Sequence, residues 1–206
     1  MKQLFLTSSA DCVLQDIVKH LPKTPKAYKL LFIGTAAESY QIEHTWVEAD
    51  KKALLKLGFQ LENYFITNRQ AKEIEAKLED KNGIFVCGGS TYYLMNQIIT
   101  TGFDKVLKEK IKQGLIYISS SAGSIIMGQK IDLVPSIEDK TQFPNSISTG
   151  LAITDYAILP HWGSQDFAKE YKAEFKDMYC QGVKILPLTN QQYLYISGET
   201  EKLIQI

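Results

Sequence analysis

The stretch Gly83–Ser120, GIFVCGGSTYYLMNQIITTGFDKVLKEKIKQGLIYISS, carries the information that decides the expected fold. It opens with one short apolar run, Gly83–Cys87, and closes with another, Leu115–Ser120, and both have the length of buried strands. Between them, Thr91–Thr100 and Lys105–Gln113 have the length expected of helices. Strands that alternate with helices in this way are typical of β-α-β units, whose strands run parallel in one sheet.

The same alternation extends over the rest of the chain. The remaining expected elements are strands at Lys2–Thr7, Lys29–Gly34, Phe59–Ile66, Tyr156–Leu159 and Val183–Leu186, helices at Asp11–His20, Trp46–Leu57, Ala71–Leu78 and Asp166–Tyr179, and a terminal hairpin of Tyr193–Ser197 and Lys202–Ile206. We therefore expect an α/β fold, a three-layer α/β/α sandwich with a mostly parallel, flavodoxin-like central sheet and a C-terminal hairpin. No linker or repeat interrupts the pattern, so residues 1–206 are expected to form one domain.

Composition narrows the functional classes. The chain has 206 residues, 23 basic and 23 acidic side chains, and only one arginine, Arg69. A neutral chain of this kind lacks the basic cluster that nucleic acid or an anionic membrane surface requires, so neither is expected as a partner. The cysteines and histidines are scattered without ligand spacing, which predicts no metal site and no cofactor. We expect a cytoplasmic protein.

The turn after Leu115–Ser120 contains the first candidate for chemistry. The apolar strand runs into the small residues Ser119-Ser120-Ser121-Ala122-Gly123 and then into an apolar helix start. This is the form of a nucleophile elbow, in which a serine projects from a sharp strand-to-helix turn. Ser121 fits best because Gly123 stands two residues after it, although Ser119 replaces the leading glycine. The alternative is a serine that caps the next helix.

The turn after Gly83–Cys87 contains the second candidate. Gly88 and Gly89 let the backbone approach a ligand closely, with a helix N-terminus behind them. Such a turn can form half of an oxyanion hole or hold a phosphate, or it can be a tight turn in which Ser90 or Thr91 caps the helix. Cys87 is a further candidate nucleophile, although a free cysteine is more often a buried apolar residue.

A serine nucleophile needs a base, most often histidine. His161 follows the expected strand Tyr156–Leu159 and so should lie at the same edge of the sheet as Ser121. An acid should orient the imidazole. Asp155 is too far back along the strand, about 20 Å at ~3.3 Å per residue. The loop before it leaves Glu138 and Asp139 as alternatives.

Three segments together resemble the peptidase E family of serine peptidases, which share their fold with class I glutamine amidotransferases. They are Phe85–Thr91, Ser121–Ser124 and Leu159–His161, in family order and at similar spacing. The resemblance covers most of the chain. It implies these roles: Ser121 as nucleophile, His161 as base, the backbone N–H groups of Gly89 and Ala122 as oxyanion hole, and Asp139 as the acid, with Glu138 as second choice.

The resemblance leaves the substrate open. Members similar to peptidase E cleave dipeptides with an N-terminal aspartate and use a cationic residue downstream of the histidine. In this chain the corresponding stretch offers Lys169, Lys172 and Lys176 but no arginine.

The sequence thus predicts a serine-type peptidase, dipeptidase-like, that hydrolyses a small peptide and exists as a monomer or homodimer. An alternative is a non-catalytic module of the same fold that binds a small ligand at the Gly88–Gly89 helix terminus. A third is a hydrolase that uses Cys87.

Overall fold

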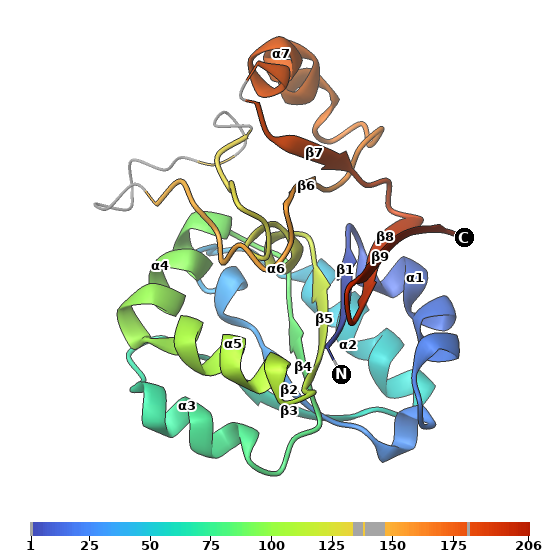
Figure 1. Cartoon of the computed structure of the whole chain (residues 1–206), viewed down its shortest axis with the longest axis vertical. Helices are drawn as coiled ribbons and strands as arrows, with labels where there is room; N and C mark the ends of the chain where they lie inside the picture. Colours follow the sequence, from blue (N-terminus) through green and yellow to red (C-terminus); the bar gives the residue numbers. More distant parts are fainter. Residues whose placement is uncertain (1, 134–137, 139–146, 181) are drawn as a thin grey trace.

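The apolar runs of the sequence assemble into a seven-stranded sheet in the computed structural model, which describes residues 2–133, 138, 147–180 and 182–206 (Figure 1). The strand order is β3-β2-β4-β5-β1-β8-β9. The five strands from β3 to β1 are parallel, and β8 and β9 extend the sheet as an antiparallel hairpin beside β1. The bounds are β1 Gln3–Thr7, β2 Lys29–Ile33, β3 Gln60–Tyr64, β4 Gly83–Val86, β5 Ile116–Ser120, β8 Gln192–Ser197 and β9 Thr200–Gln205.

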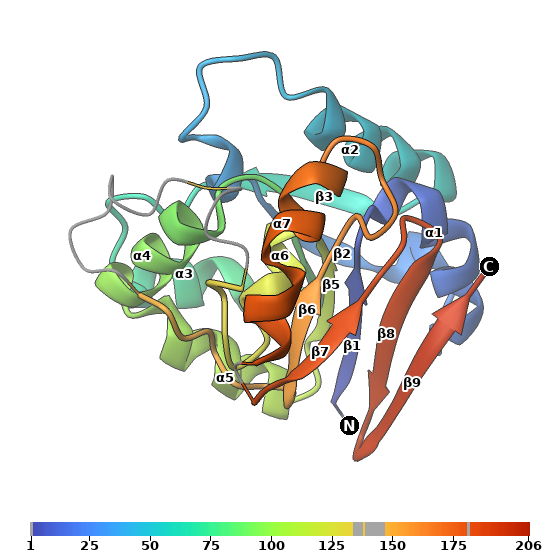
Figure 2. The same ribbon diagram turned by 90° about the horizontal axis from the view of Figure 1, so that it is seen from above.

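Helices cover both faces of this sheet. The chain moves from β1 through β2 to β3 in one direction and returns through β4 to β5 in the other, so right-handed crossovers place the two sets of helices on opposite faces. Helices α1 and α2 cover one face, and α3, α4 and α5 cover the other (Figures 1 and 2). Within the described ranges, no helix combines the length and apolar content needed to cross a membrane. The helices are α1 Ala10–Ile17, α2 Thr45–Leu57, α3 Ala71–Leu78, α4 Thr91–Thr101, α5 Phe103–Lys112, α6 Ala122–Ile125 and α7 Ala168–Tyr179.

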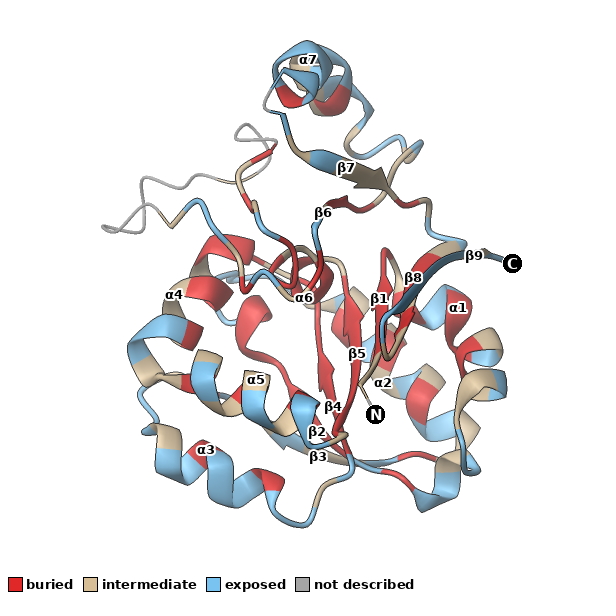
Figure 3. Cartoon of the chain, in the orientation of Figure 1, coloured by how far each residue is buried: buried red, intermediate tan, exposed pale blue. Residues whose placement is uncertain are grey.

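The main core lies along the central strands. Every residue of β4 and β5 is buried, as are nearly all residues of β1 and β2 (Figure 3). Neighbouring strands stack aromatic rings across the sheet, with the centroids of Phe32 and Phe85 5.0 Å apart. Strands buried on both faces are expected of a parallel sheet between two helical layers. The predicted fold class, including the C-terminal hairpin, is confirmed.

One pairing differs from the expectation. The segments Tyr156–Leu159 (β6) and Lys184–Pro187 (β7) are strands, but they pair with each other in a separate two-stranded parallel sheet. They pack with α7 around a small second apolar cluster, which includes Leu159, Tyr171 and Met178. Figure 1 shows this unit above the carboxyl ends of the central strands. An apolar run indicates a strand but not its partner, which here is set by contacts distant in sequence.

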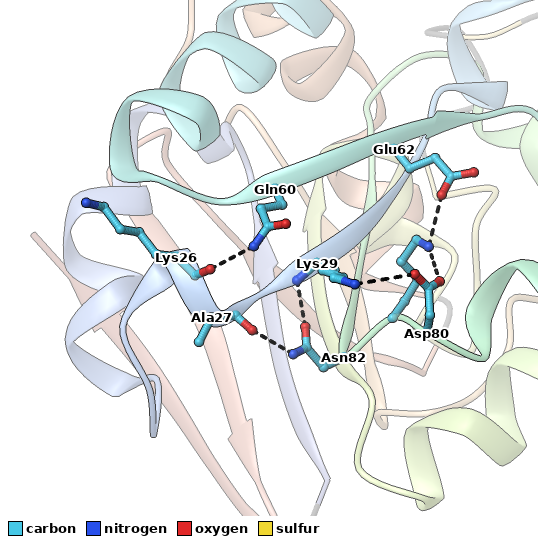
Figure 4. Close-up of polar contacts among 8 residues, drawn as sticks. Lys26, Ala27, Lys29, Gln60, Glu62, Asp80 and Asn82 are labelled. Carbon is cyan, nitrogen blue, oxygen red and sulfur yellow. Dashed lines mark hydrogen bonds and ion pairs between the residues drawn. The ribbon is translucent and has the colours of Figure 1, made fainter.

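The amino ends of the central strands are tied together by polar contacts on the opposite side of the molecule (Figure 4). The Asn82 side chain accepts a hydrogen bond from the Lys29 N–H and donates one to the Ala27 carbonyl, both at 2.8 Å. Lys81 Nζ lies 2.9 Å from a carboxylate oxygen of Glu62, which links β3 to the start of β4. These contacts hold the amino ends of the strands together, and the loops at the opposite, carboxyl ends carry the candidate site residues.

Candidate active site

Ser121 occupies the turn between β5 and α6, in a backbone conformation that residues other than glycine rarely adopt. Its φ and ψ are +46° and −108°, outside the regions favoured by residues with a Cβ. Its N–H donates to the carbonyls of Thr7 and Ser8, both at 3.1 Å, so the carboxyl end of β1 holds the turn in place. Gly123 is required because a Cβ there would lie 2.4 Å from the Val86 carbonyl oxygen.

Ser119, which replaces the leading glycine of the elbow pattern, fits this turn without crowding it. The side chain is fully buried, and its Oγ lies 2.8 Å from the Oγ of Ser124. Ser124 Oγ in turn donates to the Thr7 carbonyl at 2.7 Å. The extra hydroxyl therefore has polar partners and adds a link between β5, α6 and β1.

The structure brings His161 against Ser121. His161 follows β6 and Pro160, and its Nε2 lies 3.0 Å from Ser121 Oγ. The backbone φ of +59° is again unusual, and the N–H of His161 donates to Ser8 Oγ at 2.7 Å. The ring stacks on Phe167, with the centroids 5.2 Å apart. The strand before His161 predicts its position at the edge of the central sheet, whereas His161 reaches that edge from the separate β6–β7 sheet.

An amide and a hydroxyl, neither of them predicted from the sequence, lie behind His161. His161 Nδ1 lies 2.9 Å from Asn190 Oδ1 and 3.3 Å from Ser8 Oγ, and Ser8 Oγ donates to the same Asn190 oxygen at 2.8 Å. Because an oxygen faces Nδ1, we assign the proton to Nδ1, which leaves the lone pair of Nε2 toward Ser121. The sequence pointed only to carboxylates that precede His161, whereas Ser8 and Asn190 lie outside that stretch. Ser8 follows β1 and Asn190 precedes β8, and these adjacent antiparallel strands bring both residues to one edge.

Of the two predicted acids, the structure describes only Glu138, which binds the N-terminus of α4 instead of His161. Glu138, the second choice, accepts hydrogen bonds from the Thr91 N–H at 2.7 and 2.9 Å and from Ser90 Oγ at 2.9 Å. Its carboxylate therefore caps the N-terminus of α4, where the helix dipole and free N–H groups favour a negative charge. Asp139, the first choice, lies outside the described residues.

Burial makes the imidazole a neutral base. The pKa of His161 is lowered from its ordinary value chiefly because burial disfavours the imidazolium, while the hydrogen bond with Asn190 and the charge of Asp166 oppose this effect. Cys87 is fully buried, and burial raises the pKa of its thiol to about 12. A thiol in this environment carries no thiolate at neutral pH, which argues against Cys87 as the nucleophile.

Gly89 adopts a backbone that only glycine permits at this place. Its φ is +146°, and a Cβ would lie 2.2 Å from the Ala36 carbonyl oxygen. A Cβ on the preceding Gly88 would lie 3.2 Å from Ser121 Cβ, so this turn packs directly on the serine. Among the described residues, no backbone acceptor takes the N–H of Gly89 or that of Ala122.

Two cavities meet at Ser121 and His161. One is bordered by apolar and aromatic side chains, by Lys130 and by Glu138. The other is bordered by Asp11 and Asp50 together with aromatic rings. Gly89, Ser121 and His161 line both, so a substrate bound at the serine has room on either side. The first cavity is also lined by Thr91, Tyr92, Leu159 and Tyr171.

Asp50 is the most unusual titratable group in the second cavity. It is 2% exposed, and burial, assisted by the charge of Asp11, raises its pKa to about 7. Its Oδ1 accepts the Asp11 N–H at 3.0 Å. In the part of the chain that the structure describes, no three His, Cys, Asp or Glu side chains gather in a way that suits a metal ion.

The comparison with known proteins agrees with the resemblance found in the sequence. The profile of peptidase family S51 matches residues 4–204. The chain belongs to peptidase family S51. A relative of this S51 peptidase, "Uncharacterized peptidase Lmo0363" of Listeria monocytogenes, is 32% identical over 200 residues, which cover 97% of this chain and 96% of the relative. "Peptidase E" of Shewanella putrefaciens is 26% identical over 146 residues, 69% of this chain and 57% of that protein.

Solved structures support the same family. A crystal structure of a protein from Listeria monocytogenes EGD-e matches with a TM-score of 0.89 and 29% identity, and the match covers 100% of this chain and 99% of that one. The predicted peptidase E-like hydrolase is therefore confirmed at the level of the family, and this S51 protein is a peptidase.

Proposed function

We propose that this S51 peptidase is a serine peptidase that hydrolyses small peptides, dipeptides among them, with Ser121 as nucleophile and His161 as base. The observation that carries the proposal is the 3.0 Å distance between His161 Nε2 and Ser121 Oγ, combined with an oxygen of Asn190 behind Nδ1. A histidine held between a nucleophile and an orienting group is the geometry that activates a serine, and asparagine serves as the orienting group in some peptidases.

The proposed reaction begins with proton transfer from Ser121 Oγ to His161 Nε2 as Oγ attacks the scissile carbonyl carbon. The carbonyl π electrons move to its oxygen, and the N–H groups of Gly89 and Ala122 donate to that oxyanion. His161 then gives its proton to the leaving amine as the C–N bond breaks. Water attacks the acyl-enzyme ester, with His161 as base again, and the acid product leaves Ser121 with its proton restored.

Arg69, the one arginine of the chain, is not placed to recognise a substrate at either cavity. Arg69 lies over the ring of Tyr64, 5.9 Å from its centroid, and lines neither cavity. The lysines downstream of His161 lie on α7 and also line neither one. Lys130, which the sequence did not single out, is the one lysine among the described residues that line the first cavity.

A serine-reactive probe tests the proposed nucleophile. A fluorophosphonate should form one adduct, located on Ser121 by peptide mass spectrometry, because a neutral imidazole beside Oγ makes it nucleophilic. The same protein should cleave at least one member of a dipeptide and isopeptide panel. An unmodified Ser121 together with an inert panel would favour the non-catalytic binding module instead.

The pH dependence tests the role of Asn190. Because the base must be neutral, kcat/KM should fall as pH decreases through the pKa of His161, and the lowered pKa places this acid limb below about 6.5, the value for an exposed histidine. Asn190→Asp puts a carboxylate against Nδ1, which raises the pKa of His161 and should move the limb to higher pH. Asn190→Ala should reduce kcat about 10²-fold at all pH values because the ring loses its orientation. Identical pH profiles for the wild type and Asn190→Asp would contradict this role.

A further inference from the structure

The two cavities beside Ser121 differ in the charge that they favour. On one side the N-terminus of α4 presents N–H groups that bind the carboxylate of Glu138, and on the other side stand the carboxyl groups of Asp11 and Asp50. A dipeptide has a matching asymmetry, with an ammonium on the acyl residue and a carboxylate on the leaving residue. We infer that the N-terminus of α4 is the subsite for the free α-carboxylate of the leaving residue, and that Glu138 occupies this subsite in the free enzyme. The inference rests on the proposed function of Ser121.

The contacts of Glu138 show that a carboxylate fits this position. Its Oε2 accepts from the N–H of Thr91 at 2.7 Å, from that of Tyr92 at 3.4 Å and from Ser90 Oγ at 2.9 Å. Two successive backbone N–H groups and a hydroxyl around one carboxylate are the arrangement by which helix N-termini bind anions. Helix α4 has 11 residues, long enough for its dipole to contribute.

A second observation is independent of Glu138. The hydroxyl of Thr91 is buried, with the residue 1% exposed, and it has no hydrogen-bond partner among the described residues. Thr91 lines the same cavity as Ser121. An unpartnered buried hydroxyl is rare in folded proteins because it loses its bonds with water. A carboxylate bound there as a ligand, with a different approach from that of Glu138, provides the missing acceptor.

The anion site begins close to the glycine that packs on the serine. Gly88 packs on Ser121, and Ser90 begins the anion site only two residues further along the chain. In a dipeptide, the α-carboxylate belongs to the residue directly after the scissile carbonyl, whose Cα lies about 3.8 Å from that of the acyl residue. Apolar neighbours such as Leu159 and Tyr171 then face the side chain of that leaving residue.

The second cavity determines the direction in which a dipeptide would lie across Ser121. Its lining contains Asp11 and Asp50 and neither lysine nor arginine among the described residues. A buried carboxylate is stabilised by a cation brought by a ligand. The ammonium of the acyl residue therefore belongs on this side and the carboxylate on the side of α4. The enzyme should require a free C-terminus, whereas Glu138 competes with the substrate for the same N–H groups.

Binding to an inactive chain tests the subsite. In the Ser121→Ala protein, isothermal titration should show that Ala-Phe binds about 10-fold more tightly than Ala-Phe amide, as expected for hydrogen bonds to a charged group. Thr91→Val, which keeps the shape of the side chain, should reduce this ratio several-fold. Glu138→Gln weakens the carboxylate that competes for these N–H groups. This variant should bind Ala-Phe more tightly and should bind Ala-Phe amide with unchanged affinity.

The controls separate this subsite from the proposed function. Thr100→Val removes a hydroxyl from the exposed part of α4, where it bonds to Asn96, and should leave the ratio unchanged. Thermal melts confirm that each variant is folded. Equal binding of the acid and the amide, or a ratio that neither Thr91→Val nor Glu138→Gln alters, overturns the subsite even if Ser121 is labelled and peptides are cleaved. Failure of labelling and cleavage in the wild type would instead overturn the proposed function.

Discussion

Replacement of Ser121 by alanine is expected to lower kcat for any cleaved peptide by about 10⁶-fold, the scale seen when a serine nucleophile is removed. The Ser121→Ala chain keeps His161 and the N–H groups at Gly89 and Ala122 but has no atom that can form the acyl-enzyme. Substrate affinity should change little, since the lost hydroxyl acts mainly in the transition state. Steady-state kinetics on the best substrate of the panel measures the effect, and the fluorophosphonate adduct should disappear with it.

Cys87→Ala is the matched control for the alternative nucleophile. Cys87 is buried and its thiol stays protonated, so this variant should keep turnover within a few-fold of the wild type. Iodoacetamide should likewise leave the activity of the folded enzyme unchanged. The serine assignment is wrong if Ser121→Ala retains wild-type turnover while Cys87→Ala loses it.

The second large effect is expected at Gly89. In Gly89→Ala the added methyl group would lie 2.2 Å from the Ala36 carbonyl oxygen, and the backbone φ is +146°. The turn has to shift, which moves the N–H that we assign to the oxyanion. Loss of one such donor reduces kcat by about 10²–10³-fold, so we expect a loss of at least that size together with a lower melting temperature.

Gly182→Ala provides the comparison for Gly89→Ala. Gly182 also has a positive φ, +68°, but a Cβ there would meet none of the described atoms within 4 Å. Gly182→Ala should lose only about 1 kcal/mol of stability, the cost of a positive φ for alanine, and should keep full kcat. If Gly89→Ala is folded and as active as Gly182→Ala, the Gly89 N–H does not stabilise the oxyanion.

The fold was largely predictable because buried strands and amphipathic helices have local patterns. The helix Ala71–Leu78 and the strand Tyr156–Leu159 have the predicted bounds. The partner of that strand was not predictable, because pairing with Lys184–Pro187 depends on contacts nearly thirty residues apart in sequence. Local pattern gives the type of an element, whereas the neighbours of an isolated apolar run depend on tertiary packing.

The candidate site likewise contains residues that local sequence predicts and one that it does not. Ser121 and Gly89 stand in local motifs that require small residues, so sequence alone could nominate them. Asn190 stands in no such motif, since asparagine is a common residue in a turn before a strand. Its role depends on β8 lying antiparallel beside β1, a pairing that local sequence does not encode. A search limited to acids between Ser121 and His161 could not have found it.

The backbone conformation at Ser121 favours a residue without a side chain, whereas the proposed chemistry needs the serine hydroxyl. With φ at +46°, glycine would occupy this position with less strain than serine does. A library of variants selected only for heat resistance should therefore enrich chains that carry glycine at position 121 and lack the proposed nucleophile. Selection for stability alone would therefore act against the proposed nucleophile, so each round of such engineering needs an activity screen.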